Sequence, residues 1–283
     1  MTARNEWQRQ RPHGISGAMS GNGDYVLGTE ADEIERLGMQ HRLWRGRVLD
    51  VWARAGIGAG QTVIDVGAGP GWASADLSGI VGPEGRVIAL ERSESFVAAL
   101  RARRLANVEV RAQDVAEEPF GKGFADAAWC RWVLSFVAAP ERTVGHIADA
   151  LKPGGVAVFH EYADYSSWRL MPADAELDRF RDLVIRSWRD ADGEPDVALS
   201  LPQWLDAAGL ELVETRPLVD IVGRDDPVWQ WPAAFMATGA ARLAALGYVS
   251  AEEASSMVTV LDRAPPHARM ITPLVAELIA RKS

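Results

Sequence analysis

The sequence predicts an α/β fold in which a doubly wound, mostly parallel seven-stranded sheet carries helical insertions that cover it. Between residues 61 and 162, short apolar runs alternate with amphipathic segments of helical period, and the connections are short. This alternation is typical of a parallel sheet wound on both faces by right-handed crossovers. With 283 residues, 48% of them hydrophobic, the chain is long enough to bury one such core together with its insertions.

The elements of the core follow in chain order. Strands are predicted at the apolar runs 62–67, 86–91, 108–114, 124–133 and 156–162. Helices are predicted between them at 72–81, 93–105 and 139–151. Ser93 stands where it can cap the second of these helices, and Pro140 falls in the first turn of the third. The second and third of these helices thus carry a recognisable starting signal.

The segments outside this core break the alternation. Residues 163–200 and 224–268 have helical patterns and are too long for plain connections, so we expect packed insertions that cover one edge of the sheet. The predicted divisions are a flexible N-terminal arm (1–22), N-terminal helices over the ligand site (23–57), the α/β core (58–162), a helical insertion (163–200), a core helix and strand (201–223), a helical cover insertion (224–268) and a final strand of the sheet (269–283).

Composition narrows the classes of partner and compartment. The net charge of −9 argues against a nucleic-acid partner, because phosphate backbones are bound by basic faces. The single cysteine excludes an internal disulfide and fits a reducing, cytoplasmic location. No apolar run is long enough to span a bilayer, so no membrane partner is expected. The five histidines are scattered without zinc-ligand spacing, which predicts no metal site, and the sequence leaves monomer and homodimer open.

A glycine-rich turn follows the first predicted strand, in the stretch VIDVGAGPGWAS at 63–74. Gly67, Gly69 and Gly71 can adopt positive φ angles and let a ligand lie against bare backbone. The helix that begins next presents unpaired N–H groups and the positive end of its dipole. The turn therefore predicts a ligand that carries carboxylate or phosphate oxygens.

Two further acidic residues follow neighbouring strands. Glu91 ends the second predicted strand, where a carboxylate can accept hydrogen bonds from a ribose diol. Asp114 ends the third, where it can accept from an exocyclic amine, although an aspartate at such a turn can also be structural. The carboxyl ends of parallel strands meet at one edge of the sheet, so these groups together predict a nucleoside-containing ligand.

The type of nucleoside ligand is narrowed by two residues of the turn. Trp72 stands where the dinucleotide fingerprint needs its third glycine, and no Gly-Lys-Ser/Thr follows, so a P-loop is excluded. Asp65 precedes the glycines, and its carboxylate would repel a pyrophosphate. A ligand with a cationic group fits better. A nicotinamide-dependent oxidoreductase is retained only as an alternative.

Five segments in order resemble the motifs of one family, the class I S-adenosylmethionine-dependent methyltransferases. The segments are VIDVGAGPG (63–71), VIALERS (87–93), VRAQDVAEEPF (110–120), FADAAWCRWVLSFV (124–137) and ALKPGGVAVFHEY (150–162). The resemblance covers roughly residues 40–223 and the final strand, and it implies a Rossmann-like methyltransferase fold with S-adenosyl-L-methionine as cofactor. The N-terminal DYVLG and MQHRLW resemble a subgroup that methylates small molecules.

The resemblance also implies which residues bind the cofactor. Gly67, Ala68, Gly69 and Gly71 would pass under the methionine part, with Asp65 near its amino group; Glu91 would hold the ribose, and Gln113, Asp114 and Val115 would flank the adenine. The other cofactor-binding candidates are Tyr25, Gln40, Trp72, Arg92, Arg131 and Trp132. Arg131 has two equal interpretations, a contact to the methionine end or to a substrate carboxylate, because CRW departs from the asparagine, serine or histidine common there.

The implied chemistry is an in-line methyl transfer that depends mainly on alignment of the acceptor. A general base helps only when the acceptor is a hydroxyl or a carbon acid. The candidates lie in FHEYADY, above all His160 and Tyr162, although histidines at strand ends are often structural. Tryptophans and methionines in the insertions predict either helix core or an apolar pocket for a small, apolar or aromatic acceptor. The alternative within this family is a protein that binds the cofactor without methyl transfer, or that uses it differently.

Overall fold

A seven-stranded sheet forms the centre of the computed structural model, which describes residues 31–283; the predicted arm at 1–22 and Tyr25 lie outside the described residues. The strand order is β3-β2-β1-β4-β5-β10-β7. Strands β1 to β5 are parallel, and β10 is antiparallel to both neighbours, so the predicted fold class is confirmed. The strands are β1 Thr62–Val66, β2 Arg86–Glu91, β3 Val108–Ala112, β4 Ala125–Arg131, β5 Leu151–Asp164, β7 Leu210–Leu218 and β10 Leu274–Lys282.

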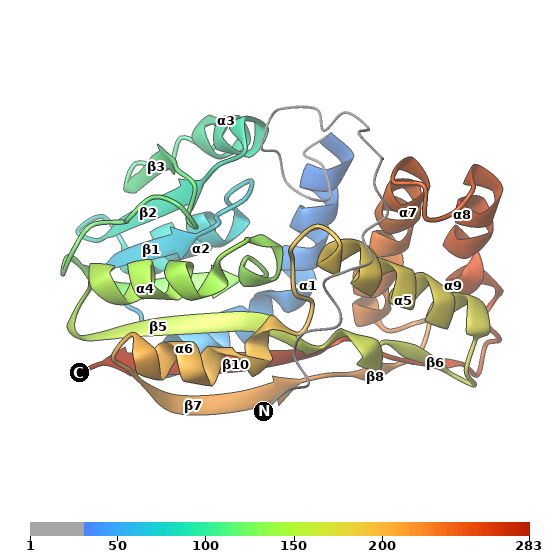
Figure 1. Cartoon of the computed structure of the whole chain (residues 1–283). Coiled ribbons are helices and arrows are strands. Elements are labelled where there is room, and N and C mark those ends of the chain that lie inside the picture. The colour runs from blue at the N-terminus through green and yellow to red at the C-terminus, as the bar shows by residue number, and fades with distance from the viewer. Residues whose placement is uncertain (1–30) are drawn as a thin grey trace, which may run out of the picture.

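The two faces of the sheet pack against different helices. Side chains alternate across a strand, so Val63 and Trp129 lie in the core that includes α1 and α2, whereas Ile64 and Cys130 lie in the core that includes α4 and α6. Both faces are covered, which is why these strands read as continuous apolar runs. In Figure 1, α4 and α6 lie in front of the sheet. These helices, with α3, are α1 Ala31–Ala55, α2 Trp72–Val81, α3 Glu94–Ala102, α4 Pro140–Ala150 and α6 Leu201–Ala207.

A helical cover stands at one end of the sheet (Figure 1). It also contains a small antiparallel sheet in the order β6-β9-β8, built from three separate parts of the chain, which the sequence analysis did not predict. The segment 269–283, predicted as one strand, forms two, because β9 joins this small sheet and β10 joins the main one. The elements of the cover are β6 Arg169–Met171, α5 Ala175–Arg189, β8 Ile221–Val222, α7 Gln230–Ala245, α8 Ala251–Val258, α9 Val260–Arg263 and β9 Arg269–Ile271.

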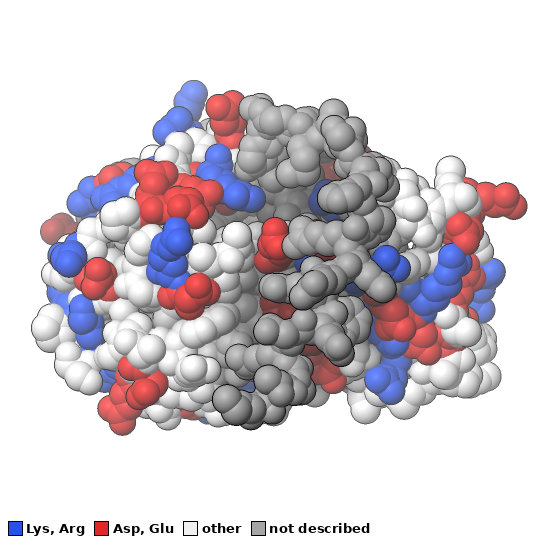
Figure 2. Space-filling view, in the orientation of Figure 1, with Lys and Arg blue, Asp and Glu red and all other residues white. Residues whose placement is uncertain are grey.

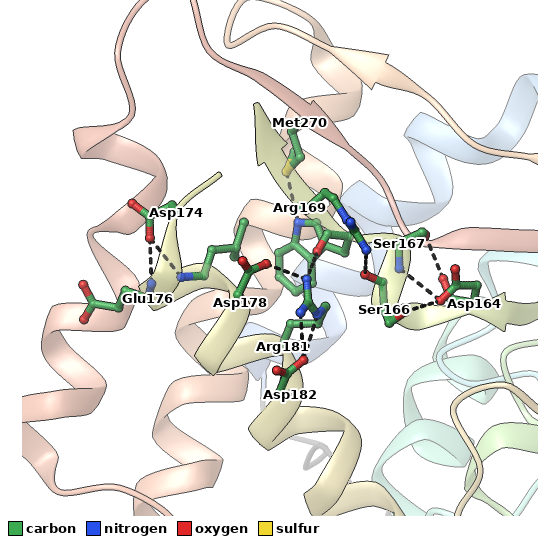
Figure 3. Close-up of polar contacts among 12 residues, drawn as sticks. Asp164, Ser166, Ser167, Arg169, Asp174, Glu176, Asp178, Arg181, Asp182 and Met270 are labelled. Atoms are coloured by element: carbon green, nitrogen blue, oxygen red, sulfur yellow. Dashed lines mark hydrogen bonds and ion pairs between the residues drawn. The ribbon is translucent and has the colours of Figure 1, made fainter. Parts of the chain in front are cut away.

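The segments that join the sheet to the cover are tied to one another. At the end of β5, Asp164 Oδ1 accepts a hydrogen bond from the backbone N–H of Ser167 at 3.1 Å (Figure 3). Ser167 Oγ in turn accepts one from the backbone N–H of Leu274, the first residue of β10, at 2.8 Å. Within the cover, Arg181 of α5 donates to the backbone carbonyl of Trp168 at 2.9 Å. These contacts fix the outgoing and returning chain segments, and with them the place of the cover.

Candidate functional site

A cavity opens at the carboxyl ends of β1, β2 and β4 and is closed on one side by α1. It encloses about 980 Å³, counted together with its open mouth. Most of the predicted cofactor-binding residues line it: Gln40, Asp65, Gly67, Ala68, Gly69, Trp72, Glu91, Arg92, Gln113, Asp114, Val115, Arg131 and Trp132. Gly71 is absent from the lining. The site stands where open α/β sheets bind ligands.

The three glycines of the turn have different structural reasons. All have positive φ angles, of 65° at Gly67, 55° at Gly69 and 81° at Gly71. A Cβ atom on Gly67 would lie 2.4 Å from a methyl carbon of Val133, and one on Gly71 would lie 2.0 Å from a methyl carbon of Leu100. A Cβ on Gly69 would meet no described atom within 4 Å. Gly67 and Gly71 are therefore both required by packing, whereas Gly69 lines the cavity and a methyl group there would enter open space.

Glu91 connects the second strand to this turn. Its Oε2 accepts a hydrogen bond from the backbone N–H of Gly69 at 2.8 Å, and its Oε1 accepts those of Arg92 and Ser93, each at 2.8 Å. Burial raises the pKa of Glu91, and these N–H groups oppose that rise. A carboxylate has about four acceptor positions, so these three bonds leave it able to accept from one hydroxyl of a ligand.

Asp65 is buried at the base of the turn. Its Oδ2 accepts a hydrogen bond from Ser74 Oγ at 2.6 Å, which fixes the first turn of α2. Burial raises the pKa of Asp65 to about 6, while Ser74 and the nearby positive charge of Arg131 oppose the rise. Asp65 and Arg131 attract one another across the cavity but form no ion pair within 4.0 Å.

Arg131 is held by two residues that the sequence analysis did not single out. Its Nη2 lies 3.1 Å from His41 Nδ1, and His41 Nε2 lies 3.0 Å from Asp76 Oδ2. Burial and the charge of Arg131 lower the pKa of His41 to about 4, so this imidazole is neutral at pH 7. Arg131 Nη1 is buried and has no hydrogen-bond partner among the described residues. Burial lowers the pKa of Arg131 to about 10, which leaves it charged at pH 7.

A second cavity, of about 420 Å³, adjoins the first and has aromatic walls. It shares Gln40, Trp132 and Phe136 with the first. Trp132 has φ of 53°, an unusual conformation for a bulky residue, and its indole stacks on the rings of Tyr162 and Trp231 with centroid distances of 5.6 and 5.5 Å. The remaining lining residues are Arg36, Tyr162, Tyr165, Trp188, Trp231, Pro232, Phe235 and Pro273.

The loop after β4, which separates the two cavities, is held by Glu161. Its Oε1 accepts the backbone N–H groups of Val133 and Leu134 at 2.9 and 3.0 Å. The side chain is fully buried, and this burial raises the pKa of Glu161 to about 7. The unusual backbone at Trp132 is thus fixed by the residue that follows His160 on β5.

The two predicted catalytic residues, His160 and Tyr162, differ in whether they line a cavity. Tyr162 lines the second cavity. His160 lines neither cavity: its ring is fully buried against those of Trp44 and Trp129, and its Nε2 lies 2.9 Å from Glu277 Oε2. Burial lowers the pKa of His160 to about 4. Trp44 of α1 thus packs against the imidazole of His160, which faces neither of the two cavities.

Within residues 31–283, no group of three or more His, Cys, Asp or Glu side chains is arranged to hold a metal ion. No helix in the same part of the chain combines the length and apolar character that crossing a bilayer requires.

Proteins and a family model similar to this chain include methyltransferases. A family model described as a methyltransferase domain matches residues 64–159. The chain is 30% identical over 123 residues to the ubiquinone/menaquinone biosynthesis C-methyltransferase UbiE of Ectopseudomonas oleovorans. The matched region covers 42% of this chain and 71% of that relative. The match covers a smaller share of other curated relatives. It spans half of UbiE from Pseudomonas putida and 35% of a 37.1 kDa protein in transposon TN4556 of Streptomyces fradiae.

Solved structures share the fold at low sequence identity. The [4+2]-cyclase SpnF superposes with a TM-score of 0.51 at 22% identity, over 83% of this chain and 80% of that one. Geranyl diphosphate C-methyltransferase from Streptomyces coelicolor A3(2), solved with Mg²⁺, geranyl-S-thiolodiphosphate and S-adenosyl-L-homocysteine, superposes with a TM-score of 0.53 at 15% identity, over 86% and 77%.

Proposed function

The chain belongs to the class I S-adenosylmethionine-dependent methyltransferases, and we propose that it transfers a methyl group from S-adenosyl-L-methionine to a small aromatic or apolar acceptor. The observation that carries this proposal is the contact between two cavities. The first lies over the glycine turn and the strand ends, the second has aromatic walls, and Gln40, Trp132 and Phe136 belong to both. A cofactor in the first would meet an acceptor in the second.

The residues of the first cavity fit this cofactor. The open space beside Gly69 leaves room for the methionine part against bare backbone, and the acceptor position that remains on Glu91 suits a ribose hydroxyl. Asp114 lines the same cavity beside Gln113, where it can take the adenine amine. When bound, the cofactor supplies a sulfonium-activated methyl group. We propose that this chain's own part is to bind, to align and to exclude water.

The second cavity supports an aromatic or apolar acceptor. Its walls carry tryptophan, tyrosine and phenylalanine side chains, and its charged lining residue Arg36 is paired with Glu33 at 2.7 Å. Ligand sites of this kind combine apolar walls with a few orienting polar groups. Among the described residues on the face drawn in Figure 2, acidic and basic side chains are interspersed and form no basic stripe, which supports a small molecule over nucleic acid.

We assign the proton-accepting role, where the acceptor needs one, to Tyr162 rather than to His160. Tyr162 stands in the wall of the acceptor cavity, whereas His160 is enclosed behind Trp44. A base of this type is within reach only if its hydroxyl faces the acceptor. We also propose a cytoplasmic location, which the buried free cysteine Cys130 supports.

Incubation with cofactor that carries a labelled methyl group, together with a panel of small aromatic metabolites, tests the proposal. Transfer of label to a metabolite is the expected result. Saturable cofactor binding without transfer to any metabolite would favour the alternative of a protein that binds the cofactor for another reaction. We retain this alternative because the chain shares its fold with a protein named a [4+2]-cyclase.

A further inference from the structure

Resting on the proposed function, we infer that Arg131 is the anion-binding residue of the cofactor cavity, and that His41 and Asp76 are positioning residues that hold its guanidinium. The bound group is a carboxylate or a comparable oxyanion. Its source is either the amino-acid end of the cofactor or an acidic group of the acceptor.

One nitrogen of the Arg131 guanidinium has no hydrogen-bond partner among the described residues. The guanidinium carries five N–H donors, and within residues 31–283 its Nη1 is buried without a hydrogen-bond partner. A buried donor without a partner is costly, and more so when it is charged. Arg131 lines the cofactor cavity. A ligand oxyanion is the group that would satisfy this nitrogen, in the charge-assisted geometry that guanidinium favours.

The guanidinium of Arg131 is held in one orientation by His41 and Asp76. Arginine can only donate, so His41 Nδ1 must accept from Arg131 Nη2, and His41 Nε2 then carries the hydrogen that Asp76 accepts. Asp76 is itself held by two hydrogen bonds from Arg45, at 2.8 and 3.1 Å. The hydrogen bonds thus run from Arg45 through Asp76 and His41 to Arg131, and they fix the tautomer of His41.

Two indole rings also contact the guanidinium of Arg131. The guanidinium carbon of Arg131 lies 5.1 Å from the ring centroid of Trp132 and 5.8 Å from that of Trp129. Such contacts stabilise a cation without using its N–H groups. The guanidinium therefore keeps its charge and its orientation, and Nη1 remains available for a ligand.

Two sources of the oxyanion agree with this geometry. Asp65 and Arg131 line one cavity as opposite charges without contact, an arrangement complementary to an amino acid whose ammonium group faces Asp65 and whose carboxylate faces Arg131. Alternatively, the adjoining Trp132 places Arg131 beside the acceptor cavity, so an acidic acceptor could supply the oxyanion.

Calorimetry on the full chain tests the inference and separates the sources. The cofactor probes are S-adenosylhomocysteine and 5′-methylthioadenosine, which lacks the amino-acid end. The acceptor probes, added to protein saturated with S-adenosylhomocysteine, are benzoate and its neutral analogue benzamide. Arg131→Met is expected to weaken one carboxylate-bearing probe by about tenfold or more, while its counterpart without the carboxylate binds as before. Loss at S-adenosylhomocysteine identifies the cofactor as the source, and loss at benzoate identifies the acceptor.

His41→Leu should change the affinity ratio between the carboxylate-bearing probe and its counterpart in the same direction but by less, because Arg131 remains and loses only its hydrogen-bond acceptor. Arg131→Lys keeps the charge without the fork and should lose part of the effect. Arg47→Met, on α1 but paired with Asp220 outside the cavity, is the matched control and should leave both ratios unchanged. Thermal midpoints report whether each variant is folded, and His41→Leu carries the test if Arg131→Met is not.

Equal ratios in wild type, Arg131→Met and His41→Leu would overturn the inference while the proposed function stands. Wild-type protein that binds neither nucleoside probe would overturn the proposed function, and the inference with it.

Discussion

Glu91 Oε2 accepts the backbone N–H of Gly69 at 2.8 Å, so the end of β2 holds the central glycine of the turn that follows β1. One carboxylate therefore shapes the turn and faces the cavity. This double role means that loss of the charge should affect stability and cofactor binding together.

Glu91→Gln is expected to weaken binding of S-adenosylhomocysteine by about tenfold or more and to lower the free energy of unfolding by roughly 1–3 kcal/mol, because its amide N–H₂ would face backbone donors. Calorimetry and urea unfolding measure the two effects. Glu94→Gln, at an exposed position three residues later, is the control. Unchanged binding in Glu91→Gln would contradict the ribose contact.

The glycines of the turn should separate stability from binding. In Gly71→Ala the new methyl group meets Leu100, so the free energy of unfolding should fall by about 1–3 kcal/mol or more. In Gly69→Ala the methyl group enters open space, so stability should fall less and cofactor affinity more. Thermal midpoints and calorimetric affinities of the two variants give the comparison. The reverse order of effects would show that the cofactor does not lie against Gly69.

These residues also show what a sequence can predict. That Gly67, Gly69 and Glu91 line one cavity can be predicted, because strand, turn and acid are near one another in the chain and fall at one edge of the sheet. His41 was not found, because its partners Asp76 and Arg131 are 35 and 90 residues away and only the packing of α1 brings them together. The same packing encloses His160, which the strand pattern alone could not reveal.

The small sheet of the cover escaped prediction for a related reason. Its strands β6, β8 and β9 are two or three residues long and come from three distant segments. Strands of this length carry too little periodicity to be distinguished from loops. Their pairing is decided by the contacts of the whole cover.

The buried carboxyl of Glu161 should make stability depend on pH. Its pKa in the folded protein is about 7, above the ordinary value of 4.5. The contribution of Glu161 to the free energy of unfolding is therefore fully present below pH 4.5 and is lost as pH rises through 7. The size is about 3 kcal/mol, from 1.36 kcal/mol for each pKa unit. Glu161→Gln, which cannot ionise, should therefore become more stable relative to wild type as pH rises from 4.5 to 8.

Urea unfolding of both proteins across this pH range makes the measurement. The stability contribution of Asp65 also falls as pH rises, whereas those of His41 and His160 fall as pH drops. These groups are present in both proteins, so their contributions cancel in the difference between the two free energies of unfolding. Parallel stability curves for wild type and Glu161→Gln would mean that Glu161 has no such raised pKa.

His160→Gln should act on stability and leave catalysis in place. The neutral imidazole contributes stability that is present above pH 6.5 and lost as pH falls through 4, and the variant should lack this decline. Removal of its buried bond to Glu277 should cost about 1–3 kcal/mol. The rate of methyl transfer per folded molecule should stay within about twofold of wild type, as in the exposed control His267→Gln. A loss of about 100-fold would restore His160 as a general base.

Tyr162→Phe tests the remaining candidate for a base. If its phenol, ionised to the phenolate, accepts the acceptor's proton, kcat should fall by about 100-fold or more in the variant, because general base catalysis contributes that much, while S-adenosylhomocysteine binds as before. Tyr165→Phe is the matched control, since both rings line the acceptor cavity and lie 4.9 Å apart in an edge-to-face contact. An equal small loss in both variants would indicate that the hydroxyls only shape the cavity. The methyl transfer would then depend on alignment alone, with an acceptor that loses its proton to water.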